Sequence, residues 1–289
     1  MTRTWATGTT ELAPGVFAYV QATGGLCIAN AGIIAGRDAT TVIDALFTPA
    51  MTQALLGETA RVAPRPIERL INTHHHVDHT LGNALFPPDT RILSHARAKE
   101  EMQRAGLSVL PLIARIAPHF ADEIAGARER LPDDTFDSAS LNLEVDGRLV
   151  RLLHFGTGHT RGDVLVHLPQ ERLLFSGDVC FFDVTPLAHE GHIGAWIGVL
   201  ERVLALDAAE TIVPGHGPIG GKDDVRRFLG YLTLIRDGAR KAFDAGASEA
   251  EAREAIDLGE YAEWEEANRL PTNVARLYAE FRGELAGML

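Results

Sequence analysis

Apolar and polar positions alternate along the chain with two different periods, and the period separates strands from helices. Apolar and β-branched residues gathered in short segments between Gly-containing turns predict strands. Apolar residues spaced by three and four predict helices over 52–63 and 193–206, and over most of the chain from 222 onward. The predicted strands are 16–20, 27–35, 40–43, 67–71, 91–94, 141–145, 148–154, 163–168, 172–175 and 211–213.

The order of these elements predicts a layered α/β fold. Between two groups of strands, residues 96–124 are mainly helical, with breaks near Pro111 and Pro118 because proline lacks a backbone donor. A four-layer α/β/β/α sandwich would bury the apolar side of every element. We therefore expect a catalytic domain over 1–221, with a helical insert at about 96–130, and a helical extension over 222–289 packed on the same domain.

Composition narrows the class of protein. The chain has 289 residues, of which 46% are hydrophobic and 23% charged, as in ordinary globular enzymes. A net charge of −12 argues against a nucleic-acid partner. With no apolar segment of bilayer length and no apolar leader, we expect a cytoplasmic protein without a membrane partner. Two cysteines predict no disulfide framework, and the sequence leaves a homodimer open.

The densest group of potential metal ligands is Thr-His-His-His-Val-Asp-His at 73–79. It directly follows a predicted strand, so His74 and His76 project to the same side by the period of two. Asp78 and His79 can then turn toward a second point nearby. Imidazole nitrogen and carboxylate oxygen bind zinc, iron or manganese. A polar turn with incidental histidines is the alternative, and four such ligands in one short segment argue against it.

Three further candidates follow predicted strands and stand beside glycines. They are His159 after Gly158, Asp178 after Gly177, and His216 between Gly215 and Gly217. Glycine lets the backbone approach a metal centre closely. Each residue alone would be an ordinary turn residue, but together with the cluster at 74–79 they predict a metal centre.

In this order, Asp44, the cluster at 74–79, His159, Asp178 and His216 resemble the signature of the metallo-β-lactamase superfamily. The resemblance implies one metal held by His74, His76 and His159 and a second held by Asp78, His79 and His216, with Asp178 bridging both. It also implies that Asp44 orders the metal-binding loop without binding metal. A helix N-cap is a second, compatible role for Asp44.

The resemblance also favours particular branches. Asp178 stands where subclass B1 β-lactamases carry a cysteine ligand, and a bridging aspartate is similar to the glyoxalase II and lactonase branches. We do not expect Cys180 to bind metal, because Asp178 already fills that role. Residues 72–107, 158–186 and 211–218 most resemble the cyclase-like branch, which includes second-ring cyclases of aromatic type II polyketide pathways.

These residues predict hydrolysis. Two divalent cations, zinc first with iron or manganese as the other candidates, would lower the pKa of a bridging water and keep hydroxide available near neutral pH. Hydroxide would attack the carbonyl of an ester, lactone or thioester in a small acyl substrate, free or carrier-bound, with Asp78 and Asp178 as catalytic carboxylates. The alternatives are a polyketide cyclase or thioesterase, a β-lactam hydrolase, and a metal-containing binding protein without turnover.

Segments without ligands are expected to wall the pocket. These are the helical residues 96–130 and 222–289 and the loop 181–192, which would overhang the metals. His189 and His192 in this loop are candidates for a substrate or proton role. For Trp196, Trp264 and Phe181, packing in the core is preferred over lining the pocket.

Overall fold

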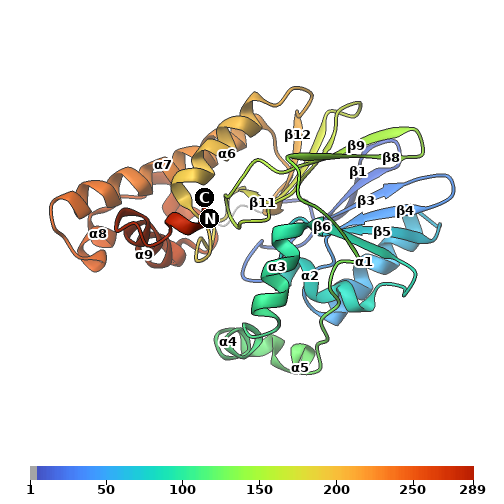
Figure 1. Ribbon diagram of the computed structural model, residues 1–289, viewed down its shortest axis with the longest axis horizontal. Helices are drawn as coiled ribbons and strands as arrows, with labels where there is room; N and C mark the ends of the chain where they lie inside the picture. Colours follow the sequence, from blue (N-terminus) through green and yellow to red (C-terminus); the bar gives the residue numbers. More distant parts are fainter. Residues whose placement is uncertain (1–4) are drawn as a thin grey trace.

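The computed structural model describes residues 5–289 and contains two β-sheets packed face to face (Figure 1). The first sheet places β1 to β7 in chain order; β1 to β4 pair antiparallel and β4 to β7 parallel. The second has the order β12-β11-β10-β9-β8, and its one parallel pair is β11 with β12. The strands are β1 Gly8–Ala13, β2 Val16–Val20, β3 Ala31–Ala35, β4 Thr40–Ile43, β5 Ile67–Ile71, β6 Arg91–His95, β7 Asp134–Phe136, β8 Ser140–Val145, β9 Arg148–Leu153, β10 Leu165–Leu168, β11 Leu173–Phe181 and β12 Thr211–His216.

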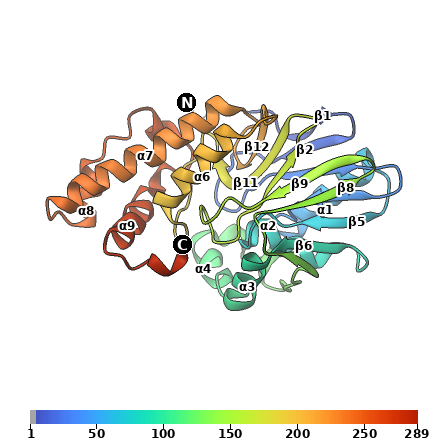
Figure 2. The same ribbon diagram turned by 45° about the horizontal axis from the view of Figure 1, so that its top comes forward.

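Helices cover the outer faces of both sheets, which gives the expected four layers (Figure 2). Helix α1 packs on the first sheet, and α6 and α7 pack on the second. Among the described residues, no helix is both long and apolar enough to cross a bilayer. The helices are α1 Pro49–Val62, α2 Val77–Thr80, α3 Ala96–Ala105, α4 Leu110–Ile116, α5 Ala121–Ile124, α6 Ile193–Ala205, α7 Lys222–Asp244, α8 Glu249–Ala255 and α9 Leu270–Phe281.

The strands of the first sheet are apolar on both faces because each face meets another layer. Ile34 and Ile71 point into the core between the sheets, whereas their neighbours Ile33 and Leu70 pack against Leu55 of α1. Successive side chains of a strand point to opposite faces, so a shift of one residue would exchange the two cores. The register is therefore fixed from both sides.

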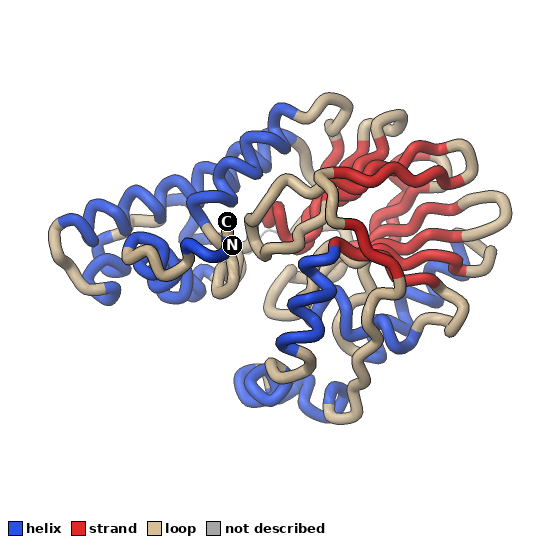
Figure 3. Tube along the Cα trace, in the orientation of Figure 1, coloured by secondary structure: helices blue, strands red, loops and turns tan. Residues whose placement is uncertain are grey.

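Two groups of helices lie outside the sheet framework (Figure 3). Helices α3 to α5 follow β6, and α7 to α9 follow β12. Helix α3 ends at Gly106, whose φ of +53° suits glycine, and Pro111 opens α4 in its first turn. The helical segment is thus broken just before Pro111, as predicted, and it is broken again before Pro118, where α4 ends at Ile116.

The strands that the sequence missed lie at sheet edges. Strand β1 is half exposed along its length, and β7 has only three residues, so neither shows a continuous apolar pattern. The predicted strand 27–35 begins only at Ala31, because Cys27 has a φ of +62°. Strand β11 continues to Phe181, beyond the predicted end at 175, and is buried throughout.

Candidate metal centre

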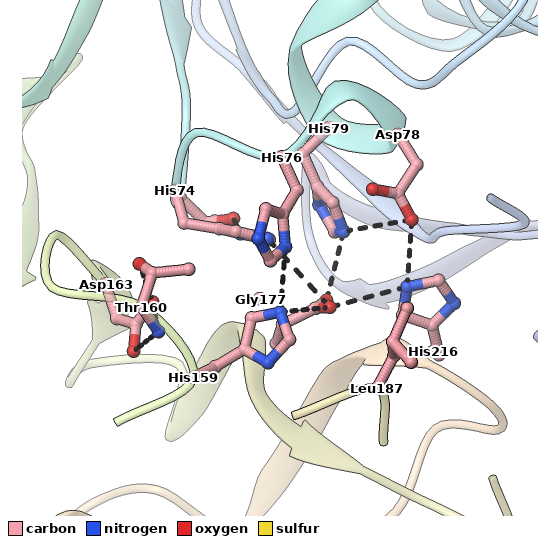
Figure 4. Close-up of polar contacts among 12 residues, drawn as sticks. His74, His76, Asp78, His79, His159, Thr160, Asp163, Gly177, Leu187 and His216 are labelled. Carbon is pink, nitrogen blue, oxygen red and sulfur yellow. Dashed lines mark hydrogen bonds and ion pairs between the residues drawn. The ribbon is translucent and has the colours of Figure 1, made fainter. Parts of the chain in front are cut away.

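The seven predicted ligands come from four segments and meet where strands of both sheets end (Figure 4). Strands β4 and β5 are parallel, as are β11 and β12, so their carboxyl ends share an edge. Asp44 and Thr73 follow the first pair. The ligand candidates lie after β5 (His74, His76, Asp78, His79), before β10 (His159), within β11 (Asp178) and at the end of β12 (His216).

The side chains form two groups that share one carboxylate. His74, His76, His159 and Asp178 form the first group, and Asp78, His79 and His216 the second. Asp178 Oδ2 lies 3.2 Å from His159 Nε2 and 3.5 Å from His216 Nε2, and Oδ1 lies 3.0 Å from His79 Nε2. Asp178 therefore contacts both groups, as the bridging role requires.

All the histidine ligand candidates except His159 have one ring nitrogen held by an oxygen and the other directed at the group; His159 Nδ1 has no partner. His79 Nδ1 donates to Asp44 Oδ2 at 2.8 Å, and His216 Nδ1 donates to the Gly24 carbonyl at 3.2 Å. Because these oxygens only accept, Nδ1 carries the proton of each neutral ring, and Nε2 is the atom left to bind a metal. His76 is reversed: its Nε2 lies 3.2 Å from Glu190 Oε2, which turns Nδ1 inward.

Several inward-facing atoms have no hydrogen-bond partner although they are buried. They are His74 Nε2, His79 Nε2 and Asp178 Oδ1. Buried polar atoms are nearly always partnered, so three such atoms at one point fit a site that binds a cation. Imidazole nitrogen and carboxylate oxygen are donors that zinc accepts, and the residues therefore fit a pair of divalent cations.

Asp44 fixes the loop after β5 through hydrogen bonds to Thr73. Its Oδ1 accepts from the Thr73 backbone N–H at 2.8 Å, and its Oδ2 accepts from the Thr73 hydroxyl at 2.7 Å. Its φ of +61° lies in the left-handed region, which aspartate tolerates better than most residues. Helix α1 takes its N-cap from Thr48, so Asp44 orders the loop and does not cap the helix.

Two glycines let β11 and β12 approach the ligand loop. A β-carbon on Gly177, which has a φ of +49°, would lie 2.5 Å from Thr73 Oγ1. A β-carbon on Gly215 would overlap Asp178 Oδ1. The close approach of backbone predicted from the flanking glycines is therefore present at both positions.

Electrostatics divides the histidines into two kinds. Burial lowers the pKa of His74 and His159, and it lowers that of His76 to about 4. Burial acts the same way on His79 and His216, but neighbouring carboxylates, above all Asp178, outweigh it; the pKa of His79 is raised, and that of His216 is raised to about 9. Without metal these two rings carry positive charge, so cations must compete with protons for them.

Glu190 joins the site although the sequence analysis did not single it out. Its Oε2 lies 2.8 Å from His75 Nε2 and 3.2 Å from His76 Nε2. Arg276 of α9 donates to the carbonyls of Glu190 and Gly191 and fixes this loop. No local pattern marks Glu190, because its partners lie more than 110 positions earlier in the chain.

The remaining candidates separate into lining and structural residues. His189 stacks on His76 with ring centroids 5.2 Å apart and lines the cavity. His192 caps α6, accepting from the Ala195 N–H, and faces Glu280, which is a structural role. Cys180 lies in the core, where burial raises the pKa of its thiol to about 12, and it belongs to neither ligand group. Trp196 is fully buried, as the packing interpretation expected.

A cavity of about 370 Å³ opens at the two ligand groups. Asp78, Asp178 and His216 line its inner end. The three segments expected to wall the pocket all contribute: 102–116 and Glu129 from the insert, Arg269 and Thr272 from the C-terminal helices, and 187–190 from the loop.

This fold and these ligand groups define a candidate metal centre between two sheets, and the comparisons with known proteins identify the family of the chain. Residues 24–216 match the family model described as the metallo-beta-lactamase superfamily, and the chain belongs to this superfamily. Among characterised relatives, the chain is 26% identical to the 2,4-dinitroanisole O-demethylase subunit alpha of a Nocardioides strain, over 63% of the chain and 51% of the relative. It is also 26% identical to a hydroxyacylglutathione hydrolase from a Synechococcus strain, over 62% of the chain and 61% of the relative.

Solved structures show the same fold. A stereoselective inverting sec-alkylsulfatase from Pseudomonas sp. matches with a TM-score of 0.75 at 20% identity, over 96% of this chain and 50% of its own. A metallo-beta-lactamase from Pontibacter korlensis matches with a TM-score of 0.60 at 20% identity, over 79% of this chain and 99% of its own. The chain thus spans about half the length of the O-demethylase subunit and of the alkylsulfatase.

Proposed function

We propose that the chain is a dinuclear-metal hydrolase, with zinc as the first candidate, that adds water to the carbonyl carbon of an ester, lactone or thioester and cleaves its acyl C–O or C–S bond. The observation that carries the proposal is the position of Asp178, whose carboxylate contacts both histidine groups. One carboxylate shared by two ligand sets suits two cations better than one. When bound, the cations supply Lewis acidity and a water of lowered pKa.

The residues of this chain hold and orient the reacting groups. Asp78 and Asp178, the catalytic carboxylates of the proposal, both line the cavity, so a substrate there reaches the metal ligands directly. Asp78 Oδ2 lies 3.3 Å from His216 Nε2, which fixes its direction. Arg269, buried nearby, adds a positive charge that offsets the carboxylates.

Two observations support an ester, lactone or thioester as the substrate in preference to a β-lactam. The relative from Synechococcus is named a hydroxyacylglutathione hydrolase. The centre also has no cysteine among its ligand candidates, and such a thiolate is the feature of subclass B1 β-lactamases. The substrate we expect is a small acyl compound, free or bound to a carrier.

The test is a panel of substrates given to the protein loaded with zinc. We expect kcat/KM on a lactone and an aryl thioester to exceed that on nitrocefin and on an alkyl sulfate by about 100-fold or more. A β-lactam value of about 10⁴ M⁻¹s⁻¹ or more, with acyl substrates far below it, would overturn the assignment. No turnover of any substrate by a protein that holds two metals would favour a binding role.

A further inference from the structure

The cavity at the metal centre continues away from the ligands as an apolar pocket. Met102 of α3, Leu107 of the following turn, and Leu112, Ile113 and Ile116 of α4 line this outer part. The inner end, by contrast, carries the carboxylates and imidazoles of the two ligand groups. A molecule that fills the cavity therefore meets hydrocarbon at one end and the metal centre at the other.

Two side chains of this outer part are exposed to an unusual degree. Leu112 is 46% and Ile116 57% exposed, and among residues 5–289 the only other large hydrophobic residues in this class are Leu85 and Leu289. Positions four apart lie on one face of a helix, so Leu112 and Ile116 form one apolar strip. An exposed apolar strip that continues into a cavity indicates a surface that a ligand covers.

The charges around the cavity exclude an anionic group at the outer end. Arg269 is the only lysine or arginine among the described lining residues, and its guanidinium donates to the Thr185 carbonyl. Glu129 also lines the cavity, and burial raises its pKa. A carboxylate or phosphate there would have no free cation to meet.

We propose that this pocket receives a long, neutral, apolar acyl chain of the substrate, and that Leu112 and Ile116 determine the preferred chain length. The position of the carbonyl at the metals rests on the proposed function, whereas binding of the chain does not. The continuity of the pocket with the metal centre favours the substrate itself as the occupant over a second protein.

The first measurement is the rate on p-nitrophenyl esters of two to ten acyl carbons, with the zinc-loaded protein. Each methylene buried is worth about a fourfold rise in kcat/KM, so we expect an increase of at least about 100-fold from acetate to the best chain. In the double variant Leu112→Gln with Ile116→Gln, the ratio of kcat/KM on the best chain to kcat/KM on acetate should fall by about tenfold or more. The rate of the same protein on acetate is the reference for this comparison, because the acetyl chain is too short to reach α4.

The matched control is Leu85→Gln, which replaces an exposed leucine outside the cavity. It should keep the full chain-length dependence. All three replaced residues are exposed, and thermal midpoints within about 3 °C of each other would verify that the fold is retained.

A second measurement tests binding without chemistry. The neutral probe N-phenyl-1-naphthylamine should bind the zinc-loaded protein and be displaced by octanol, and its affinity should fall at least about fivefold in the double variant alone. If the probe behaves so and no ester is hydrolysed, the proposed function fails and the pocket assignment stands. If esters are hydrolysed with no chain-length dependence and the probe does not bind, the pocket assignment fails. A double variant that changes oligomeric state and keeps the chain-length dependence also overturns it, because the strip would then be a subunit contact.

Discussion

Asp178 concentrates several roles in one side chain. It lies within 4 Å of His74, His79, His159 and His216, and its own pKa is held well below the usual value because these rings outweigh the effect of burial. A carboxylate with this many imidazole neighbours is ionised at all ordinary pH values. In the proposed dinuclear centre, Asp178 would therefore bind both cations without first having to lose a proton.

Replacing Asp178 should weaken both metal sites, because the proposal gives this ligand to both cations. We expect Asp178→Ala to bind fewer than two zinc ions per chain and to lose more than about 100-fold in kcat/KM. Cys180→Ser, two positions further on, should keep both metals, because Cys180 lies in the core. Elemental analysis of the two variants separates the cases, and loss of metal from the Cys180 variant would contradict the ligand assignment.

Glu190 should act through His76. Its carboxylate holds His76 Nε2 and thereby orients Nδ1 toward the first ligand group. We expect Glu190→Gln to weaken zinc binding by about 10-fold to 100-fold, as is usual when the partner of a metal-binding histidine is lost. Glu129→Gln is the control, since it also lines the cavity but contacts no ligand. Equal zinc affinities by competition with a chelator would exclude the positioning role.

At the residue scale, the sequence predicted the ligand candidates that a short sequence pattern marks. The cluster at 74–79 could be recognised because its ligands are adjacent, and His159, Asp178 and His216 because glycines mark them. Glu190 and the tautomer of each ring depend on contacts across the fold, such as that from Glu190 to His75, and no local pattern encodes them. The role of each ligand remains a prediction until metal is measured.

Among the elements, β11 and β12 are the pair on which the centre depends. Their parallel register shifts between Phe175 and Phe181, which bends β11 and aims Asp178 at the loop after β5. The sequence predicted that β11 ends at 175, because Gly177 interrupts the apolar pattern. The buried interior strands were predicted well, whereas β1 was missed because its residues are mostly polar and part-exposed, and β7 because it has only three residues.

Gly215→Ala should damage the centre without changing a ligand. The added methyl group would overlap Asp178 Oδ1, so the carboxylate must move. We expect weaker zinc binding and at least about tenfold lower kcat/KM. Gly198→Ala, in α6 with open space around it, should leave zinc binding unchanged and raise stability by up to about 1 kcal/mol. If the Gly215 variant binds zinc like the wild type, the close packing of β12 on Asp178 is not needed for the site.

His95, at the end of β6, should make stability depend on pH. Burial, with the neighbouring His154, lowers its pKa to about 4. The neutral ring thus contributes stability that is complete above about pH 6.5 and is lost as pH falls toward 4, because the unfolded chain takes up the proton first.

The expected loss from His95 is about 2 kcal/mol at pH 5. His95→Asn keeps an acceptor for the Arg97 N–H and removes the titration. Between pH 7.5 and 5, the melting temperature of metal-free protein should fall by roughly 4 °C less in this variant than in the wild type. His119→Asn, at an exposed position, should follow the wild type; equal falls in all three proteins would contradict the assignment.

At the scale of the whole molecule, hydrogen bonds from α9 connect the C-terminal helices to the metal centre. Arg276 of α9 holds the Glu190 loop, and Asn273 of α9 accepts from the Ala188 N–H. The core under α6 is shared with α7 and α9, so these helices pack on the sandwich as one body. The division into a catalytic domain over 1–221 and an extension over 222–289, and the likeness to the cyclase-like branch, remain predictions.

Removing the metals should lower the stability of the whole chain. Without cations, the carboxylates of Asp44, Asp78 and Asp178 remain close together, each within 4.0 Å of a ring nitrogen of His79. At free zinc about 1,000 times the dissociation constant, binding contributes about 4 kcal/mol, so a chelator should lower the melting temperature by roughly 8 °C. Added zinc should restore it, and an unchanged melting temperature after verified metal loss would show that the centre is not coupled to folding.

The last residues lie beside the metal centre, and this has a practical consequence. The Met288 carbonyl accepts from the Thr157 hydroxyl at 2.8 Å, and Gly287 and Met288 border a hollow lined also by His75 and Glu190. Any polypeptide that continues after Leu289 starts at this point. A histidine affinity tag attached there would bring additional imidazoles within reach of the predicted metal ligands, and metal counts or rates measured on such a fusion would describe the tag together with the protein.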